Sequence, residues 1–197
     1  MESSNEIFSF HLMKLPLMKV PFFLLKPTDK FSGLLHSESF FTMNLGTPIL
    51  FSSRYNFNTV AFFAWWKEEY FLNQFLESPS LRFFSNGWHV RMKLYRRWGQ
   101  VSELKDANLS PELAKPDKSV VAVTLARLNI LQTARFIKWG KPVERQVRDH
   151  QGQTMALAAI RPLNTFSTFS IWKNESELMN MVNGRHQQDG DSHKLAM

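Results

Sequence analysis

The sequence contains two similar stretches, and each predicts a strand that runs directly into a helix. Residues Asn58–Lys67 read NTVAFFAWWK, and Asn164–Lys173 read NTFSTFSIWK. Shorter matches occur in the same order upstream, at offsets of about 106 to 113 residues: Thr42-Met43 with Thr154-Met155, and Leu12–Leu15 with Leu125–Leu128. The repetition predicts a duplicated structural unit.

The first half predicts the element order β-α-β-β-α-β. Strands are expected where apolar runs end at turn residues, and helices where apolar residues recur at helical spacing. The clearest helix is Lys67–Glu77, whose stripe is formed by Phe71, Leu72, Phe75 and Leu76. The other expected elements are strands at 7–15, 40–45, 58–66 and 88–98, and a helix at 17–26.

The second half repeats this order but stops early. Strands are expected at 119–128, 154–160 and 165–172, with a basic helix from 130 to about 150, broken near Gly140. A last helix starts at a predicted capping box, in which Asn174 accepts from a first-turn amide and Glu177 reaches back. No strand is expected after this helix. Either the sequence is shortened or a partner chain supplies the missing edge, so we expect a homodimer.

Each half therefore has the ferredoxin-like pattern, with antiparallel strands on one side of two helices. The expected fold class is α+β, with two fused repeats at 5–98 and 119–197 and a linker at 99–118 that carries Pro111 and Pro116. Because neither sheet can cover its second face alone, the repeats are expected to form one compact domain. The 197 residues, 44% of them hydrophobic, are enough for such a core.

Composition excludes several classes of protein. The sequence has no cysteine, so disulfides and thiolate sites are excluded, and no leader pattern precedes the first strand, which favours a cytoplasmic protein. No apolar stretch approaches the ~20 residues of a spanning helix, which leaves at most peripheral membrane contact. Phosphate-binding loops, esterase elbows, zinc-protease and dinucleotide motifs are absent.

The net charge of +7 favours an anionic partner. The basic residues form two clusters, which we interpret as solvated faces of amphipathic elements. The clusters are Arg91, Lys93, Arg96 and Arg97, and Arg135, Lys138, Lys141, Arg145 and Arg148.

Two segments of the second half carry a family resemblance. Thr168–Trp172 reads TFSIW and leads into the last helix, and His193–Met197 reads HKLAM. With the two fused units, these segments resemble the spheroidene monooxygenase family, part of the dimeric α/β-barrel superfamily. The resemblance implies a haem-containing oxygenase that acts on a long, apolar, carotenoid-like substrate. Relatives with this barrel include haem-binding chlorite dismutases and aldoxime dehydratases.

The resemblance also implies site residues. His193 matches the expected axial haem ligand, and His186 is the second candidate, within an inserted stretch at 185–192. Arg127 lies near the family's basic position, where it would meet a haem propionate. The haem pocket is expected between the sheet and the helices of the second unit. Its candidate lining residues are Phe63, Met155, Phe169 and Trp172.

Three other functions remain open. The barrel could work without haem, as antibiotic-biosynthesis-type monooxygenases do, and a Soret band separates these two cases. It could instead bind an apolar ligand without catalysis, because a fold does not fix a function. Ferredoxin-like sheets also form RNA-binding modules, but the sequence lacks their aromatic strand motif, so we expect no nucleic-acid partner.

Overall fold

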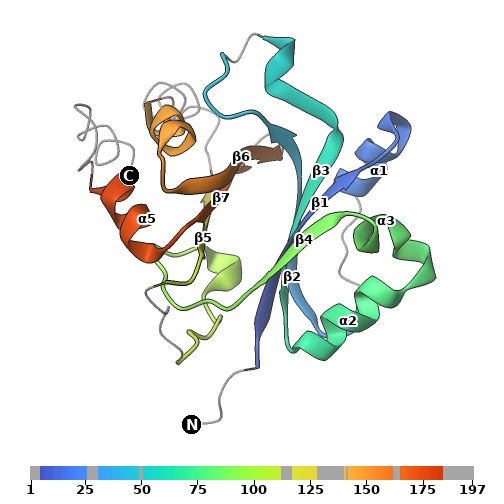
Figure 1. Cartoon of the computed structure of the whole chain (residues 1–197). Coiled ribbons are helices and arrows are strands. Elements are labelled where there is room, and N and C mark those ends of the chain that lie inside the picture. The colour runs from blue at the N-terminus through green and yellow to red at the C-terminus, as the bar shows by residue number, and fades with distance from the viewer. Residues whose placement is uncertain are drawn as a thin grey trace. The chain divides into compact units, whose positions relative to one another are not determined.

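The computed structural model describes residues 5–25, 31–48, 51–111, 117–127, 140, 142–161 and 165–183. The chain forms two compact units (Figure 1). The first consists of Met1–Phe41 and Asn56–Leu113, and the second of Thr42–Tyr55 and Ala114–Met197. No helix within the described ranges is long and apolar enough to cross a bilayer.

The first unit has the predicted order of strands and helices. Its strands are arranged β4-β1-β3-β2. β1 is antiparallel to both neighbours, with Ile7 opposite Trp66 of β3 and Leu12 opposite Trp88 of β4. The elements are β1 (Ile7–Lys14), α1 (Val20–Leu25), β2 (Leu34–Met43), β3 (Tyr55–Trp66), α2 (Glu69–Glu77), α3 (Arg82–Ser85) and β4 (Trp88–Met92), with short 3-10 turns at Leu17–Lys19, Pro79–Leu81 and Ser102–Leu104.

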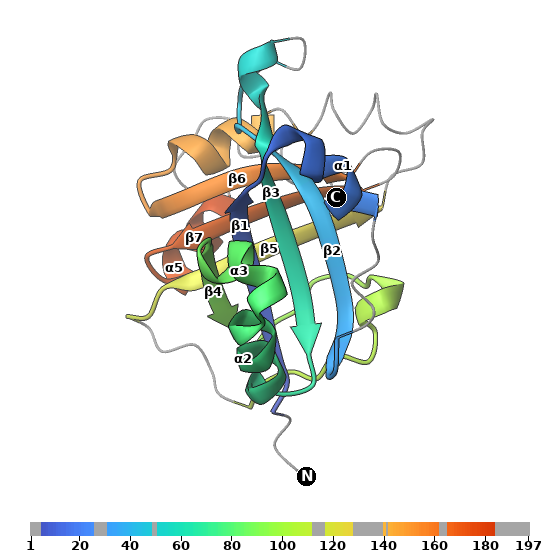
Figure 2. The ribbon, with the colours of Figure 1, turned by 90° about the vertical axis from the view of Figure 1, so that its right-hand side faces the viewer.

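The helices of this unit cover one face of its sheet (Figure 2). Alternate residues of β3 face them, and Phe62 and Trp66 are fully buried there against Phe75 of α2. Phe84 of α3 packs edge-on to Phe62, with ring centroids 4.9 Å apart. Because side chains alternate along a strand, the other residues of β3 face away from the helices.

The second unit has three described strands in the order β6-β7-β5. Val120 of β5 lies opposite Trp172 of β7, and Arg127 lies opposite Thr165. Its elements are β5 (Val120–Arg127), a helix at 142–149, β6 (Gln153–Arg161), β7 (Thr165–Trp172) and α5 (Glu175–Val182). Residues 184–197, which follow α5, lie outside the described ranges, so the prediction that no strand follows this helix stays a prediction.

A buried ion pair fixes the segment Thr42–Tyr55 within the second unit. Arg54 donates to both carboxylate oxygens of Glu144, at 3.0 and 2.7 Å, and both side chains are at least nine-tenths buried. The amide of Gly46 donates to the same carboxylate at 3.0 Å. Arg54 also donates to the carbonyl of Thr47. The carboxylate is therefore satisfied by partners from a single loop.

Internal contacts confirm the duplication. The Lys67 amide donates to the carbonyl of Gly33 at 2.8 Å, and the Lys173 amide donates to that of Gly152 at 2.9 Å. In both units the first strand starts opposite the tryptophan that ends the third. One predicted match is wrong, however. Thr42 lies near the end of β2 whereas Thr154 is the second residue of β6, so these threonines are not equivalent.

The strand boundaries differ from the expectation at two places. β2 starts at Leu34 rather than at residue 40. The polar residues that interrupt its apolar pattern in the sequence, including His36, are part of the strand. β4 ends at Met92 rather than at residue 98, where it lies opposite Phe8, one residue from the start of β1. The chain continues within the first unit, where Ala107 is buried.

The predicted cap of α5 is confirmed in its first half. The Asn174 side chain accepts from the Glu177 amide at 3.0 Å. The Glu177 carboxylate, by contrast, lies 3.9 Å from Nδ1 of His150, and the Glu177 side chain packs beside Gly152. Most of the predicted helix at 130–150 falls on residues 128–139, outside the described ranges, and its end at 142–149 is helical.

Candidate functional site

The helix side of the second sheet is closely packed. Trp172 is fully buried there, its indole nitrogen donates to Ser170 at 2.8 Å, and its ring meets His150 at 5.2 Å. Leu178 and Met181 of α5 are buried in the same layer. The described side chains between the sheet and the helices are thus core residues.

The opposite face of this sheet carries an apolar strip that ends in arginine. Strand pairing places every second residue of β5 on the same side as Thr165 and Phe169 of β7. Phe169 is fully buried, whereas the β5 residues are half-buried. We call this set the β5 strip; its members are Val121, Val123, Leu125 and Arg127.

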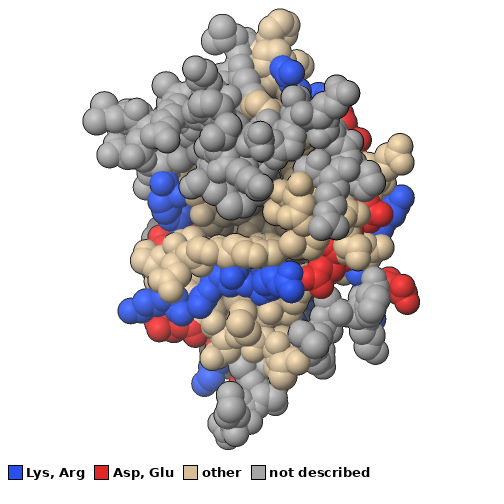
Figure 3. Space-filling view, turned by 90° about the vertical axis from the view of Figure 1, so that its left-hand side faces the viewer, with Lys and Arg blue, Asp and Glu red and all other residues tan. Residues whose placement is uncertain are grey.

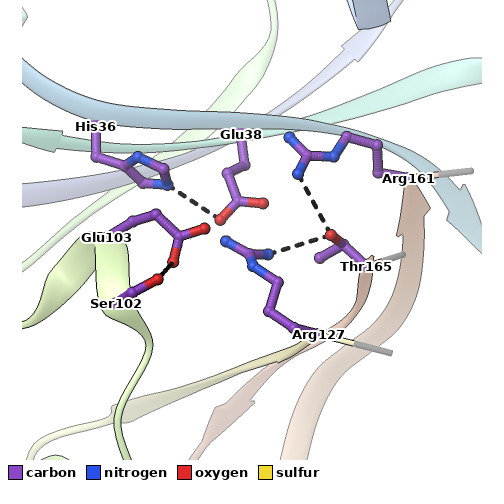
Figure 4. A network of polar contacts seen from close by, with 7 residues as sticks. All are labelled: His36, Glu38, Ser102, Glu103, Arg127, Arg161 and Thr165. Atoms are coloured by element: carbon purple, nitrogen blue, oxygen red, sulfur yellow. Dashed lines mark hydrogen bonds and ion pairs between the residues drawn. The ribbon is translucent and has the colours of Figure 1, made fainter. Parts of the chain in front are cut away.

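Two guanidinium groups converge at the end of the β5 strip (Figure 4). Arg127 donates to the Thr165 hydroxyl at 3.2 Å, and Arg161 of β6 donates to it at 3.4 Å. All three residues share one position along the sheet, because Thr165 pairs with Arg127 on one side and with Arg161 on the other. Thr165 itself is buried. Paired guanidinium groups with fixed donors suit a carboxylate or another oxyanion.

The first unit carries a polar pair on β2, formed by His36 and Glu38. Nε2 of His36 lies 3.1 Å from the carboxylate of Glu38, whose side chain is fully buried (Figure 4). The same figure shows Glu103, which accepts from the Ser102 hydroxyl at 2.7 Å. An imidazole that is hydrogen-bonded to a carboxylate is a common proton-transfer pair in enzymes.

Two of the four residues predicted to line a haem slot share one face of the second sheet. Met155 and Phe169 lie on the face of the β5 strip. Trp172 lies on the opposite, helix side, and Phe63 belongs to the first unit, where it stacks on Phe8 at 5.7 Å. The predicted ligands His193 and His186 lie outside the described residues.

Sequence reasoning missed Arg161, Thr165, His36 and Glu38 as site residues. Arg161 had a usable signal, since it ends a predicted strand immediately before Pro162 and faces the start of the next strand. His36 and Glu38 stand two residues apart and so share one strand face. Their strand was expected to begin only after them, which removed that signal.

A buried histidine lies on the helix side of the first sheet. Nε2 of His11 is 2.9 Å from the Ser9 hydroxyl, and its ring stacks on His89 at 5.3 Å. Burial lowers the pKa of His11 to about 3, and the charges of His89 and Arg91 act in the same direction. Burial and Arg91 also lower the pKa of His89. Within the described ranges, no three metal-binding side chains come together.

Three arginines of the first basic cluster contact neighbouring residues. Arg91 pairs with Glu69, Arg97 donates to the Leu104 carbonyl at 2.7 Å, and Arg96 lies over Trp98. On the face drawn in Figure 3, Lys and Arg side chains form a band beside Asp and Glu.

The described residues meet two of the three requirements for haem. The β5 strip offers an apolar surface, and Arg127 and Arg161 carry the positive charge that propionates require. The third requirement is an axial ligand. The histidine described in the second unit, His150, lies on the helix side and not on this face.

Comparison with known proteins shows the fold. The sequence matches no family model and no curated protein. An aldoxime dehydratase crystallised with butyraldoxime has a TM-score of 0.53 at 10% identity, over 98% of this chain and 74% of that one. A proposed monooxygenase of Fusobacterium nucleatum has a TM-score of 0.36 at 10% identity, over 98% and 84%. A chlorite dismutase of Candidatus Nitrospira defluvii has a TM-score of 0.29 at 13% identity, over 98% of this chain and 87% of that one. The two ferredoxin-like repeats thus form a fold of the dimeric-α/β-barrel type.

Proposed function

We propose that the chain is an oxygenase of the dimeric-α/β-barrel type that binds haem on the β5 strip and acts on a long apolar substrate. The observation that carries this proposal is the convergence of Arg127 and Arg161 on Thr165 at the end of an apolar strip. A planar apolar ligand with two carboxylates at one edge fits this arrangement. The strip runs over about 20 Å, enough for a porphyrin, at the usual rise of a strand.

Each residue has a distinct part in this proposal. Arg127 and Arg161 hold the propionates. The Thr165 hydroxyl accepts a hydrogen bond from each guanidinium group and so holds both of them at the end of the β5 strip. Val121, Val123 and Leu125 contact the porphyrin or the apolar substrate and exclude water. His193 would bind the haem iron, with His186 as the alternative. Haem, when bound, supplies the iron chemistry that amino-acid side chains lack.

Haem titration tests the proposal directly. We expect a Soret band at one equivalent of haem, which is lost or shifted in His193→Ala and kept in His186→Ala. Arg127→Gln and Arg161→Gln should each weaken haem binding by roughly 10-fold or more, because each removes a charge-assisted contact. Arg96→Gln, at an exposed arginine of the first unit, is the matched control. Absence of the Soret band under conditions that load a known haem barrel would overturn the haem proposal.

The His36–Glu38 pair supports a second candidate, a haem-free monooxygenase in which this pair removes a proton from the substrate. This function needs no axial ligand. It is distinguished by substrate oxidation that persists without haem and is lost in both His36→Gln and Glu38→Gln.

A further inference from the structure

The segment that follows β1 carries apolar side chains on its solvent-facing side as well as on its buried side. Val20 is buried, and Phe23 packs on Phe84 and Phe62 with ring centroids 5.5 and 6.0 Å apart. On the outer side, Leu17 is 63% exposed, Met18 is 85% exposed and Phe22 is 69% exposed. A helix that is apolar all round is normally buried in a core or a membrane.

A further exposed aromatic residue lies at the same end of the first unit. The Leu15 amide donates to the Asn58 carbonyl at 2.8 Å, which fixes the start of this segment beside the start of β3. Phe57, next along β3, is exposed on the opposite face of the sheet, because it alternates with Asn58, Val60 and Phe62. Figure 2 shows α1 and the start of β3 at one end of the strands. We call the exposed residues of the segment that follows β1 the apolar tip; its members are Leu17, Met18 and Phe22. Scattered exposed apolar residues are ordinary, but a gathered set marks a contact surface.

The charges around the apolar tip have one sign. Lys14 and Lys19 are exposed beside it, and residues 7–28 contain no Asp or Glu. Apolar side chains flanked by lysines match a bilayer surface, where the apolar groups enter the acyl boundary and the lysines meet anionic headgroups. A protein partner would need acidic groups around an apolar pocket, and nothing in the chain selects such a partner.

We propose that the apolar tip docks the protein on an anionic lipid surface. Pro16 and Pro21 restrict the backbone on each side of Leu17 and Met18, so the segment is already ordered before it meets the lipid. The apolar tip enters the headgroup region without spanning the bilayer. This surface would bring the protein to the compartment where long apolar molecules dissolve, but the docking does not depend on what the β5 strip binds.

Vesicle co-sedimentation of the full chain tests the proposal. We expect binding to phosphatidylcholine vesicles that contain about 30% phosphatidylglycerol, and much weaker binding to pure phosphatidylcholine. The triple variant Leu17→Ser, Met18→Ser, Phe22→Ser should lose at least roughly 100-fold in affinity, since three exposed apolar side chains no longer enter the lipid. Lys14→Gln and Lys19→Gln should each lose about fivefold at low salt.

A matched control removes exposed apolar groups elsewhere. Tyr70→Ser, Trp98→Ser, Leu109→Ser changes three residues of similar exposure outside the apolar tip and should bind vesicles like the wild type. Equal binding of both triple variants would overturn the proposal, and so would equal binding to neutral and anionic vesicles. Light scattering without lipid tests the alternative that the apolar tip contacts a second copy of the chain. If the triple variant at the apolar tip turns a dimer into a monomer and keeps vesicle binding, the surface joins two copies of the chain instead.

Discussion

Trp66 and Trp172 occupy the same position in the two units, at the end of the strand that leads into a helix, and the indole nitrogen of each donates to a serine hydroxyl at 2.8 Å. The serines differ. Trp66 bonds Ser9 on the neighbouring strand, whereas Trp172 bonds Ser170 on its own strand. Both tryptophans are fully buried. The duplication has therefore kept the buried donor and changed the source of its acceptor.

Replacing either tryptophan by phenylalanine should destabilise the protein. Trp66→Phe and Trp172→Phe each remove a hydrogen bond and leave a void, so we expect losses of roughly 1–3 kcal/mol in the free energy of unfolding. Urea unfolding followed by circular dichroism measures this. Trp98→Phe, at a residue 58% exposed, is the control and should change stability by less than about 0.5 kcal/mol. Equal costs at buried and exposed sites would contradict the packing described above.

Gly33 should be intolerant of alanine for two separable reasons. Its φ of 70° favours glycine, and an added Cβ would overlap the ring of Phe71 on α2. Gly99 has a φ of 73° with open space around it. Gly99→Ala therefore measures the backbone cost alone, roughly 1–2 kcal/mol. We expect Gly33→Ala to cost a further 1–3 kcal/mol or so from overpacking. Equal losses in the two variants, measured by thermal or urea unfolding, would show that Phe71 moves aside freely.

Removing one partner of the buried Arg54–Glu144 pair should lower the free energy of unfolding strongly. Glu144→Gln leaves a buried guanidinium without its countercharge, for which we expect a loss of about 3–5 kcal/mol. Asp149→Asn breaks the exposed pair with Arg148 and should cost less than about 1 kcal/mol. The double variant Arg54→Met, Glu144→Leu should be more stable than Glu144→Gln. If it is less stable, the pair itself contributes net stability.

His11 should make the protein less stable in mild acid. Its folded pKa of about 3 lies below the ordinary 6.5, so the unfolded chain binds a proton that the folded chain excludes between these values. Stability is therefore full above about pH 6.5 and falls as the pH drops towards 3. Between about pH 7 and pH 5 the loss should be about 2 kcal/mol from this group.

His11→Gln tests this assignment, because its amide can still meet Ser9 but does not titrate. The variant should show a correspondingly shallower pH dependence of urea unfolding. The wild-type imidazole should also show no proton-NMR titration above about pH 4. A titration near 6.5 would mean that His11 is solvated in solution.

Much of the fold was predictable because the repeat and the strand periodicity report the same units. The strand that ends at Trp66 and the one that ends at Trp172 are both clear, since apolar residues dominate each of them. The site was harder to predict. Arg161 and Thr165 meet only because two strand ends pair, and pairing across a turn does not follow from composition. His36 and Glu38 made β2 look like a loop, because polar residues on one face interrupt its apolar run.

The strand at the end of the described sheet order gives a last prediction. In the first unit β1 pairs with β3 on one side and β4 on the other, whereas its counterpart β5 lies at the end of the described strand order. β5 reads VVAVTLAR, an apolar strand without proline or an internal charge, which is the kind of edge that pairs with another chain. We expect a dimer by light scattering.

A lysine on this edge should weaken the association. Thr124→Lys places one charge on β5 of each copy, and antiparallel pairing of two β5 strands would bring these charges close together. We expect the dimer dissociation constant to rise by roughly 10-fold or more. Asn86→Lys, at an exposed residue after α3, adds the same charge away from the edge and should leave the dimer unchanged. A wild-type monomer, or a Thr124→Lys dimer as tight as the wild type, would show that β5 is not the dimer contact.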